Sequence, residues 1–254
     1  MSKWAILGTY VGSIAHGTYR PNTEPNSIDD KDVLFVCVPD ESYYFGLKEL
    51  GSRGTVTVKQ DPYDIVAYEA RKFVRLLAQG NPNVLCVLWM ERKHFVRLEP
   101  AGQLLLDARM AFVGKHVYHS FAGYAFGQLH RMEHGALEGY MGAKRKALVE
   151  KFHFDTKNAS HLIRLLRMCC EFLASGEMIV SRPDAPELLS IKDGAWSLER
   201  VKAEADRLFK LAEEAYLHSA LPNRPDAEAV SRICIDVVRA ALETRHDGQS
   251  SSQD

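Results

Sequence analysis

Short apolar runs separated by loop-forming residues fill the N-terminal part of the chain. Val33–Val38 is a continuous run of β-favouring residues that Pro39 ends, which predicts a buried central strand. A loop over residues 19–27, rich in proline and asparagine, precedes it, and residues 51–60 predict a turn followed by another strand. Trp4–Val11 fits either a short strand or the end of a helix, because so brief an apolar run has no decisive period.

Apolar residues follow helical spacing from Ile65 onward. Ala70, Phe73, Val74 and Leu77 form one stripe, which residues 80–83 (Gly-Asn-Pro-Asn) end, and a second helix is predicted over residues 84–89. Later in the chain the pattern predicts one helix after another, with a persistent break only at residues 181–194. The expected helices span residues 101–110, 115–134, 139–151, 156–176, 197–218 and 226–244.

This order of elements predicts an α+β fold in which strands are confined to the first part of the chain. We expect a mixed sheet with helices over residues 1–95 and an all-α helical domain over residues 96–245. Residues 246–254 are polar enough to predict a disordered tail.

Composition narrows the choice of partners. With 254 residues, of which 46% are hydrophobic, the chain is long enough to bury a substantial core, and its formal charge of −1 at pH 7 provides no general attraction to nucleic acid or membranes. The sequence has neither a basic N-terminal segment followed by an apolar core nor an apolar run of about 18 residues, so we expect a cytoplasmic protein without a membrane partner. Five scattered cysteines without CxxC spacing favour reduced, packed thiols over a zinc site.

The segment with the clearest chemistry joins a small-residue turn to a pair of carboxylates. Gly12-Ser13 can bring backbone N–H groups and a hydroxyl close to phosphate oxygens, and Asp30 and Asp32 precede the predicted strand. Residues i and i+2 of a strand point the same way, so the two carboxylates would lie side by side and favour a hard cation such as Mg²⁺. Each pattern alone is common in turns, whereas the two in this order favour a phosphate-transfer site.

These residues resemble the fingerprint of the DNA polymerase β-like nucleotidyltransferase superfamily. The sequence is most similar to the predicted nucleotidyltransferases associated with RNA ligases, often called RlaP. The similarity covers most of residues 5–90. It is carried by Gly12-Ser13-x-x-His16-Gly17-Thr18, by Asp30-x-Asp32, and by the block from Asp64 through Tyr68, Arg71, Lys72 and Phe73 to residues 80–83.

The resemblance implies a role for each matching residue. Ser13 would contact the triphosphate together with Gly12 and His16. Asp30 and Asp32 would be metal ligands, and Asp64 would be a third carboxylate that helps to activate the acceptor hydroxyl. Two alternatives remain at this stage: Asp61 could replace Asp64, and Asp29, which stands where many relatives have serine, could be confused with Asp30.

A basic stripe is predicted on one helix of the second half. Lys157, His161 and Arg164 lie at i, i+4 and i+7, on the face that is expected to be opposite Leu162, Leu165 and Leu166. The stripe resembles the K-x-x-x-H-x-x-R helix of the same family, which implies contacts to nucleotide phosphates or an RNA backbone. Arg71, Lys72 and residues 144–146 could add further RNA contacts.

Together these features predict a metal-dependent nucleotidyltransferase. It would move a nucleoside monophosphate from an NTP to a hydroxyl and release pyrophosphate, using Mg²⁺ or alternatively Mn²⁺. The resemblance implies that the acceptor is an RNA end and that an RNA ligase or other repair protein is a partner. Two alternatives remain open: an acceptor on a protein or small molecule, and a non-catalytic nucleotide- or RNA-binding module.

Overall fold

A computed structural model describes residues 2–21, 29–134 and 143–250 of the chain. Its described part contains one five-stranded mixed sheet with strand order β3-β4-β2-β1-β5. Strands β2 and β4 are parallel, and the other neighbouring strands are antiparallel. The strands are β1 (Ala5–Tyr10), β2 (Lys31–Cys37), β3 (Thr55–Gln60), β4 (Tyr63–Glu69) and β5 (Phe95–Leu98). The α+β class predicted from the sequence is confirmed.

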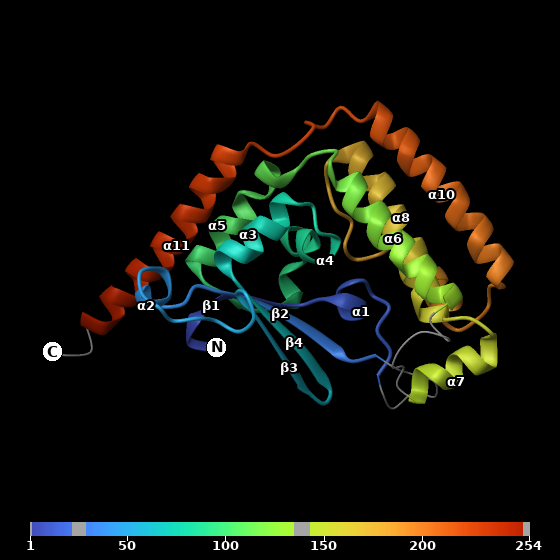
Figure 1. The fold of residues 1–254 in the computed structure, drawn as a ribbon, viewed down its shortest axis with the longest axis horizontal. Coiled ribbons are helices and arrows are strands. Elements are labelled where there is room, and N and C mark those ends of the chain that lie inside the picture. The colour runs from blue at the N-terminus through green and yellow to red at the C-terminus, as the bar shows by residue number, and fades with distance from the viewer. Residues whose placement is uncertain (1, 22–28, 135–142, 251–254) are drawn as a thin grey trace.

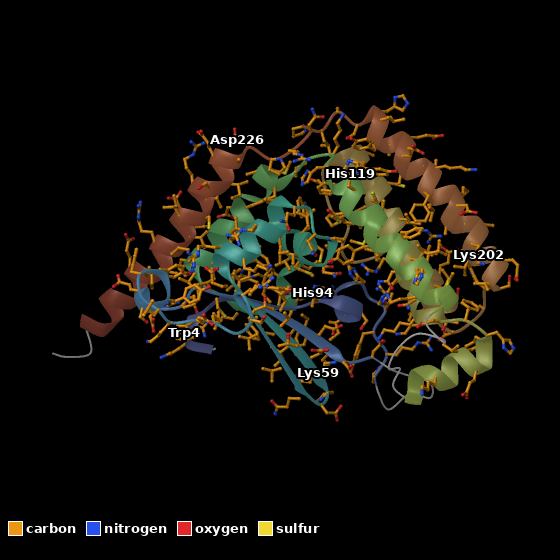
Figure 2. The ribbon with its side chains drawn as sticks, viewed as in Figure 1. Trp4, Lys59, His94, His119, Lys202 and Asp226 are labelled. Atoms are coloured by element: carbon orange, nitrogen blue, oxygen red, sulfur yellow. The ribbon has the colours of Figure 1, made fainter. Side chains whose placement is uncertain are left out.

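Helices cover one face of the sheet. Leu34 and Val36 of β2 alternate with Phe35 and Cys37, and only the first pair joins the main core beneath the helices. Helices α3 and α5 pack on this face, and the β3–β4 hairpin projects beyond them, with Lys59 near its tip (Figures 1 and 2). The short elements of this half are η1 (Ser2–Trp4), α1 (Gly12–Ala15), α2 (Glu41–Tyr44), α3 (Ala70–Ala78), α4 (Pro82–Leu85), η2 (Cys86–Trp89), η3 (Arg92–His94), α5 (Pro100–Asp107) and η4 (Arg109–Phe112).

Longer helices form the second half of the fold. Helices α6, α8 and α10 pack together, and α9 packs on α8 (Figure 1). Local signals fix the ends of α8: Asp155 accepts a hydrogen bond from Asn158 N at its start, and Gly176 adopts a left-handed conformation at its end. The helices are α6 (Val117–His134), α7 (Ala143–Phe152), α8 (Thr156–Ser175), α9 (Ala185–Lys192), α10 (Leu198–His218) and α11 (Ala227–Ser250).

The last helix returns to the first half of the chain. Helix α11 packs on α3 and α5, and Val237 and Ala241 are buried there. Arg245 also donates hydrogen bonds to the carbonyl oxygens of Trp4 and Pro39, each at 3.3 Å. The predicted boundary between two domains at residue 95 stays a prediction, and β5 continues the sheet to Leu98. No helix in the described residues is both long and apolar enough to span a membrane.

Several local expectations were wrong. Residues 65–69 belong to β4, and the helix begins at Ala70, where the Glu69 side chain accepts hydrogen bonds from Arg71 N and Lys72 N. β5 was not predicted, and the supposed break at residues 181–194 contains α9. Helix α11 continues to Ser250, five residues into the expected disordered tail, and residues 251–254 lie outside the described part.

Candidate active site

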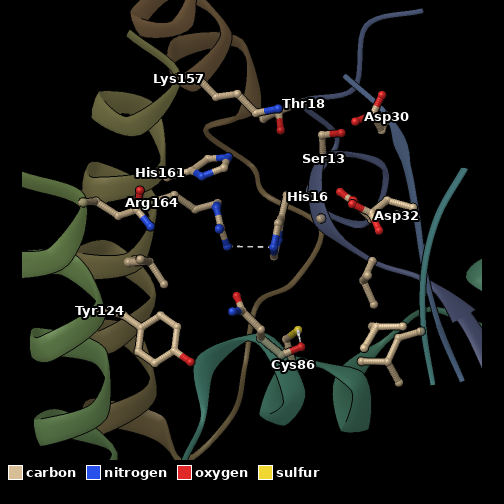
Figure 3. A pocket seen from close by; sticks show the side chains of 18 of the residues that line it. Ser13, His16, Thr18, Asp30, Asp32, Cys86, Tyr124, Lys157, His161 and Arg164 are labelled. Atoms are coloured by element: carbon tan, nitrogen blue, oxygen red, sulfur yellow. Dashed lines mark hydrogen bonds between the residues drawn. The ribbon is translucent and has the colours of Figure 1, made fainter. Parts of the chain in front are cut away.

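A cavity of about 600 Å³ lies between the sheet and the second half of the fold. Figure 3 shows the carboxylates of Asp30 and Asp32 on one side and Lys157, His161 and Arg164 on the other. All nine site residues predicted from the sequence line this cavity: Gly12, Ser13, His16, Asp30, Asp32, Asp64, Lys157, His161 and Arg164. Their roles stay predictions, but residues separated by as many as 152 positions in the sequence share one space.

The parallel pairing of β2 and β4 builds the acidic wall. Asp32 and Asp64 are direct partners in the register, so their side chains lie on the same face of the sheet. The preceding Asp30 also lines the cavity. Three carboxylates therefore line the cavity near the beginning of two parallel strands.

Asp32 is in an unfavourable position for a negative charge. Burial, together with the nearby charges of Asp64 and Asp30, raises its pKa to about 6, although Lys157 acts in the opposite direction. The carboxylate therefore gains from any cation that enters beside it.

The two alternative aspartates considered from the sequence, Asp29 and Asp61, do not line the cavity. Asp29 is only 1% exposed, does not line the cavity and forms an ion pair with Lys192. Its Oδ1 also lies 3.4 Å from Lys157 Nζ, and its Oδ2 accepts a hydrogen bond from Arg20 N at 3.0 Å. Asp61 lies in the turn between β3 and β4, and Asp64, not Asp61, lines the cavity.

Gly12 and Ser13 begin α1, a single helical turn beside the acidic wall. Gly12 has a φ of 60°, and a Cβ atom at this position would collide with Asp32 Oδ2. Glycine is thus required both for the backbone conformation and for the close approach of the carboxylate. Ser13 lines the cavity beside it (Figure 3).

Arg164 gives the opposite wall a buried positive charge. Its side chain is held by two contacts, from Nη1 to His16 Nε2 at 2.6 Å and to Met168 Sδ at 3.4 Å. Burial lowers its pKa to about 10, so the guanidinium stays charged at neutral pH. Among the described residues it forms no ion pair with a carboxylate, which leaves it available to an anionic ligand.

The two histidines of the cavity are neutral. Burial, followed by the charge of Arg164, lowers the pKa of both His16 and His161 well below the usual range. His161 lies between Lys157 and Arg164 on α8 (Figure 3). The fixed positive charge of the wall therefore comes from Lys157 and Arg164.

The acidic wall fits a hard divalent cation that is only partly enclosed by protein. Within the described ranges, no group of three or more His, Cys, Asp or Glu side chains is arranged to hold a metal ion by itself. Asp30, Asp32 and Asp64 offer oxygen atoms, and Mg²⁺ usually combines one or two carboxylates with water and substrate phosphates. The donor chemistry agrees with such an ion.

The other basic positions predicted to contact RNA are not part of this cavity. Arg71 lines a separate hollow beside α11, where its guanidinium lies over the rings of Tyr43 and Tyr44 and contacts Glu69. Lys146 is exposed on α7, whereas the side chains of Lys144 and Arg145 lie outside the described part. The side chain of Arg71 thus packs against Tyr43, Tyr44 and Glu69 instead of facing this cavity.

Helix α6 contributes residues that the sequence did not reveal as part of the site. Tyr124, Gln128 and Arg131 line the cavity from this helix. They lie at i, i+4 and i+7, but the same spacing fits an ordinary solvated helix face. Only the packing of α6 on α8 turns this face toward the carboxylates.

Comparison with known proteins identifies the family of the chain. The sequence matches the RNA repair pathway DNA polymerase beta family over residues 5–231. Among solved structures, a nucleotidyltransferase-like protein from Exiguobacterium sibiricum 255-15 is 11% identical, with 93% of this chain and 74% of that chain covered and a TM-score of 0.28. No curated protein matches. The family match extends over far more than half of the sequence, so the chain belongs to the RNA repair pathway DNA polymerase β family of nucleotidyltransferases (RlaP).

Proposed function

We propose that this protein transfers a nucleoside monophosphate from an NTP to a hydroxyl group and releases pyrophosphate. The supporting observation is the presence of opposite charges across one cavity: Asp30 and Asp32 face Lys157 and Arg164, and Asp64 lines the same cavity. A triphosphate needs positive groups around its oxygens, and its cations need carboxylates. The two walls supply both.

Asp30, Asp32 and Asp64 are the residues that would hold Mg²⁺ or Mn²⁺. When bound, such ions neutralise phosphate charge and lower the pKa of an attacking hydroxyl. The unfavourable charge of Asp32, whose pKa is raised to about 6, supports cation binding because a neighbouring positive ion relieves it.

The residues of the chain divide the work of the reaction. The acceptor oxygen forms a bond to the α-phosphorus while the bond from that phosphorus to the bridging oxygen breaks, and the electron pair leaves with pyrophosphate. In this proposal Asp64 accepts the proton of the hydroxyl. Ser13 orients the triphosphate, and Lys157 and Arg164 balance the charge that develops on the leaving group.

We propose an RNA end as the acceptor, in an RNA repair reaction of the cytoplasm. The description of the matching family supports this choice, and an RNA ligase is the partner that would act on the product. Backbone contacts to RNA depend strongly on salt. Binding of RNA that weakens steeply with rising salt is therefore expected, and filter binding across a salt series measures it.

Transfer of label from α-³²P-NTPs tests the reaction. Each of the four NTPs is incubated with RNA, protein or small-molecule fractions in Mg²⁺ or Mn²⁺, and labelled RNA is expected. Asp64→Asn should lower the rate by about 100-fold or more. The matched control is Asp61→Asn, three residues away and outside the cavity, which should retain full activity.

Two results would contradict the proposal. Equal losses in both variants would remove the assigned role of Asp64, and retained transfer by Asp32→Asn would remove the carboxylate site. Label found on protein or small molecules, with none on RNA, would reject the RNA acceptor while keeping the transfer chemistry.

A further inference from the structure

His16 has no ring nitrogen left for a ligand. The side chain is 4% exposed, and its Nδ1 lies 2.9 Å from the carbonyl oxygen of Val180. Its Nε2 lies 2.6 Å from Nη1 of Arg164. Both polar atoms of the imidazole are therefore engaged by protein groups.

The chemistry of the two partners fixes the protonation of the ring. A guanidinium can only donate hydrogen bonds and a carbonyl oxygen can only accept them. Nε2 must therefore be the acceptor and Nδ1 must carry the hydrogen, which is one neutral tautomer of histidine. An imidazolium would direct a second N–H at the positive charge of Arg164.

This arrangement fixes the orientation of the Arg164 side chain. Arg164 is 9% exposed, lies on the cavity wall and forms no ion pair with a carboxylate among the described residues. An arginine side chain has several rotatable bonds, and its entropy works against a single orientation. The contact from His16, at the end of α1, and the sulfur of Met168 select one orientation within the cavity.

We infer that His16 is a positioning residue: it accepts a hydrogen bond from Arg164 and so holds that guanidinium where substrate phosphates bind. This assignment rests on the proposed function, and it replaces the direct nucleotide contact expected for His16 from the sequence. Val180 lies between α8 and α9, so one imidazole connects the loop after α1, helix α8 and the following loop.

Two amide substitutions separate the bonds of His16. In His16→Gln, the amide oxygen can take the place of Nε2 and accept from Arg164, but the bond to Val180 is lost. In His16→Asn, the shorter amide can donate to Val180 O, as Nδ1–H does, but leaves Arg164 without its acceptor. A merely structural role predicts similar defects in both variants.

The measurement is calorimetric binding of inorganic pyrophosphate to the full chain, with melting curves to check folding. His16→Asn is expected to weaken binding by about 10-fold or more, and His16→Gln by much less. In an Arg164→Met background the difference between the two should vanish, because the residue through which His16 acts is gone. Equal losses, or a difference that persists without Arg164, would overturn the inference.

A second measurement needs no substitution. The ¹⁵N spectrum of histidine-labelled protein at pH 7 should contain a neutral imidazole protonated at Nδ1, and assignment of His16 to the other tautomer or to imidazolium would overturn the inference. These results are distinguishable from failure of the proposed function. Absence of both pyrophosphate binding and label transfer in the unaltered chain rejects both, whereas equal losses in the two amide variants reject only the role of His16.

Discussion

At the scale of single residues, the cavity contains neighbouring carboxylates that are partly shielded from water. Asp32 is in register with Asp64, and its Oδ2 occupies the space that a side chain at residue 12 would need. Such an arrangement costs stability in the absence of a ligand, which is common where residues are selected for function. The cost can be measured through the titration of Asp32.

We predict that Asp32→Asn raises the melting temperature in EDTA at pH 7.5 by about 2–4 °C, the shift expected for about 1 kcal/mol in a chain of this size. The raised pKa of about 6 means that the folded chain binds this proton more tightly than the unfolded chain. The contribution of Asp32 to stability is therefore complete below about pH 4 and is lost as the pH rises through about 6. Differential scanning fluorimetry across this range measures the effect.

The rise in melting temperature caused by Asp32→Asn should accordingly be largest above pH 6 and disappear toward pH 4. A gain that is constant with pH would point to packing instead of charge. Addition of Mg²⁺ at pH 7.5 should stabilise the unaltered chain more than Asp32→Asn, because only the unaltered chain keeps this carboxylate.

Gly12 provides a second test at the same scale. Gly12→Ala is predicted to lower stability by about 1–3 kcal/mol and to reduce transfer, since the added methyl group meets Asp32 and the φ of 60° disfavours alanine. Gly123→Ala is the matched control: it lies in α6 with open space around its Cβ position. That change should stabilise the chain by about 0.5–1 kcal/mol. Urea unfolding of both variants gives the comparison.

Residue types and spacing were sufficient to select nine of the residues that line the cavity, but neither the contribution of α6 nor the partners of the buried charges. Asp29 was an alternative to Asp30 in the sequence, and its ion pair with Lys192 spans 163 positions that no local pattern connects. The contact between His16 and Arg164 spans 148 positions. Such pairs depend on how α8 and α9 dock on the sheet, which the periodicity of each segment does not contain.

At the scale of elements, the parallel pairing of β2 and β4 is the arrangement that matters most for the site. It brings Asp64 beside Asp32, and the turn containing Asp61 stays outside the cavity. The sequence misled us here, because the helical spacing was predicted to begin at Ile65, and Val66 does lie on the same helical face as Ala70 and Phe73. A short apolar segment satisfies both periods, and only its neighbours in the sheet decide between them.

Strand β5 and helix α9 were not predicted for a similar reason. β5 has only four residues, too few for a clear alternation, and pairs with β1 at the edge of the sheet. Helix α9 has only eight residues, which give few repeats of the helical period, and the proline in its first turn is well tolerated there. Long helices such as α8 and α10 were placed within a residue or two because their amphipathic period repeats several times.

Helix α11 allows a prediction about packing. Val237→Ala should destabilise the chain by about 1–3 kcal/mol, since Val237 is fully buried where α11 packs on the first half. Ile235→Ala on the same helix is the control: Ile235 is 50% exposed, and its truncation should cost clearly less. Denaturant unfolding measures the loss of unfolding free energy in each variant, provided that the dependence on denaturant concentration is the same. Equal costs would contradict the burial of one side of the helix.

At the scale of the whole molecule, polar contacts connect the two halves beside the cavity. Lys192 of α9 pairs with Asp29 and donates to Thr18 O at 3.4 Å. Lys157 approaches the same Asp29 from α8, and Arg20 pairs with Asp193. These contacts hold the segments that follow α1 and precede β2 against α8 and α9.

The buried pair should dominate this connection. Lys192→Met is predicted to cost about 2–4 kcal/mol, because it leaves the carboxylate of Asp29 buried with one partner fewer. The double variant Asp29→Asn/Lys192→Met should recover part of the loss, which a double-mutant cycle in urea measures. Arg20→Gln, at the partly exposed pair with Asp193, should cost less than about 1 kcal/mol. Simple additivity of Asp29→Asn and Lys192→Met would exclude the coupling.

The return of α11 to α3 and α5 has a consequence for biosynthesis. A ribosome emits the sheet early, then helices α6 to α10, and only afterwards α11, which covers the apolar surfaces of α3 and α5. Those surfaces stay open to solvent for most of translation, when nascent chains are most prone to aggregate. The packing around α3 and α5 is thus complete only after α11 has been synthesised.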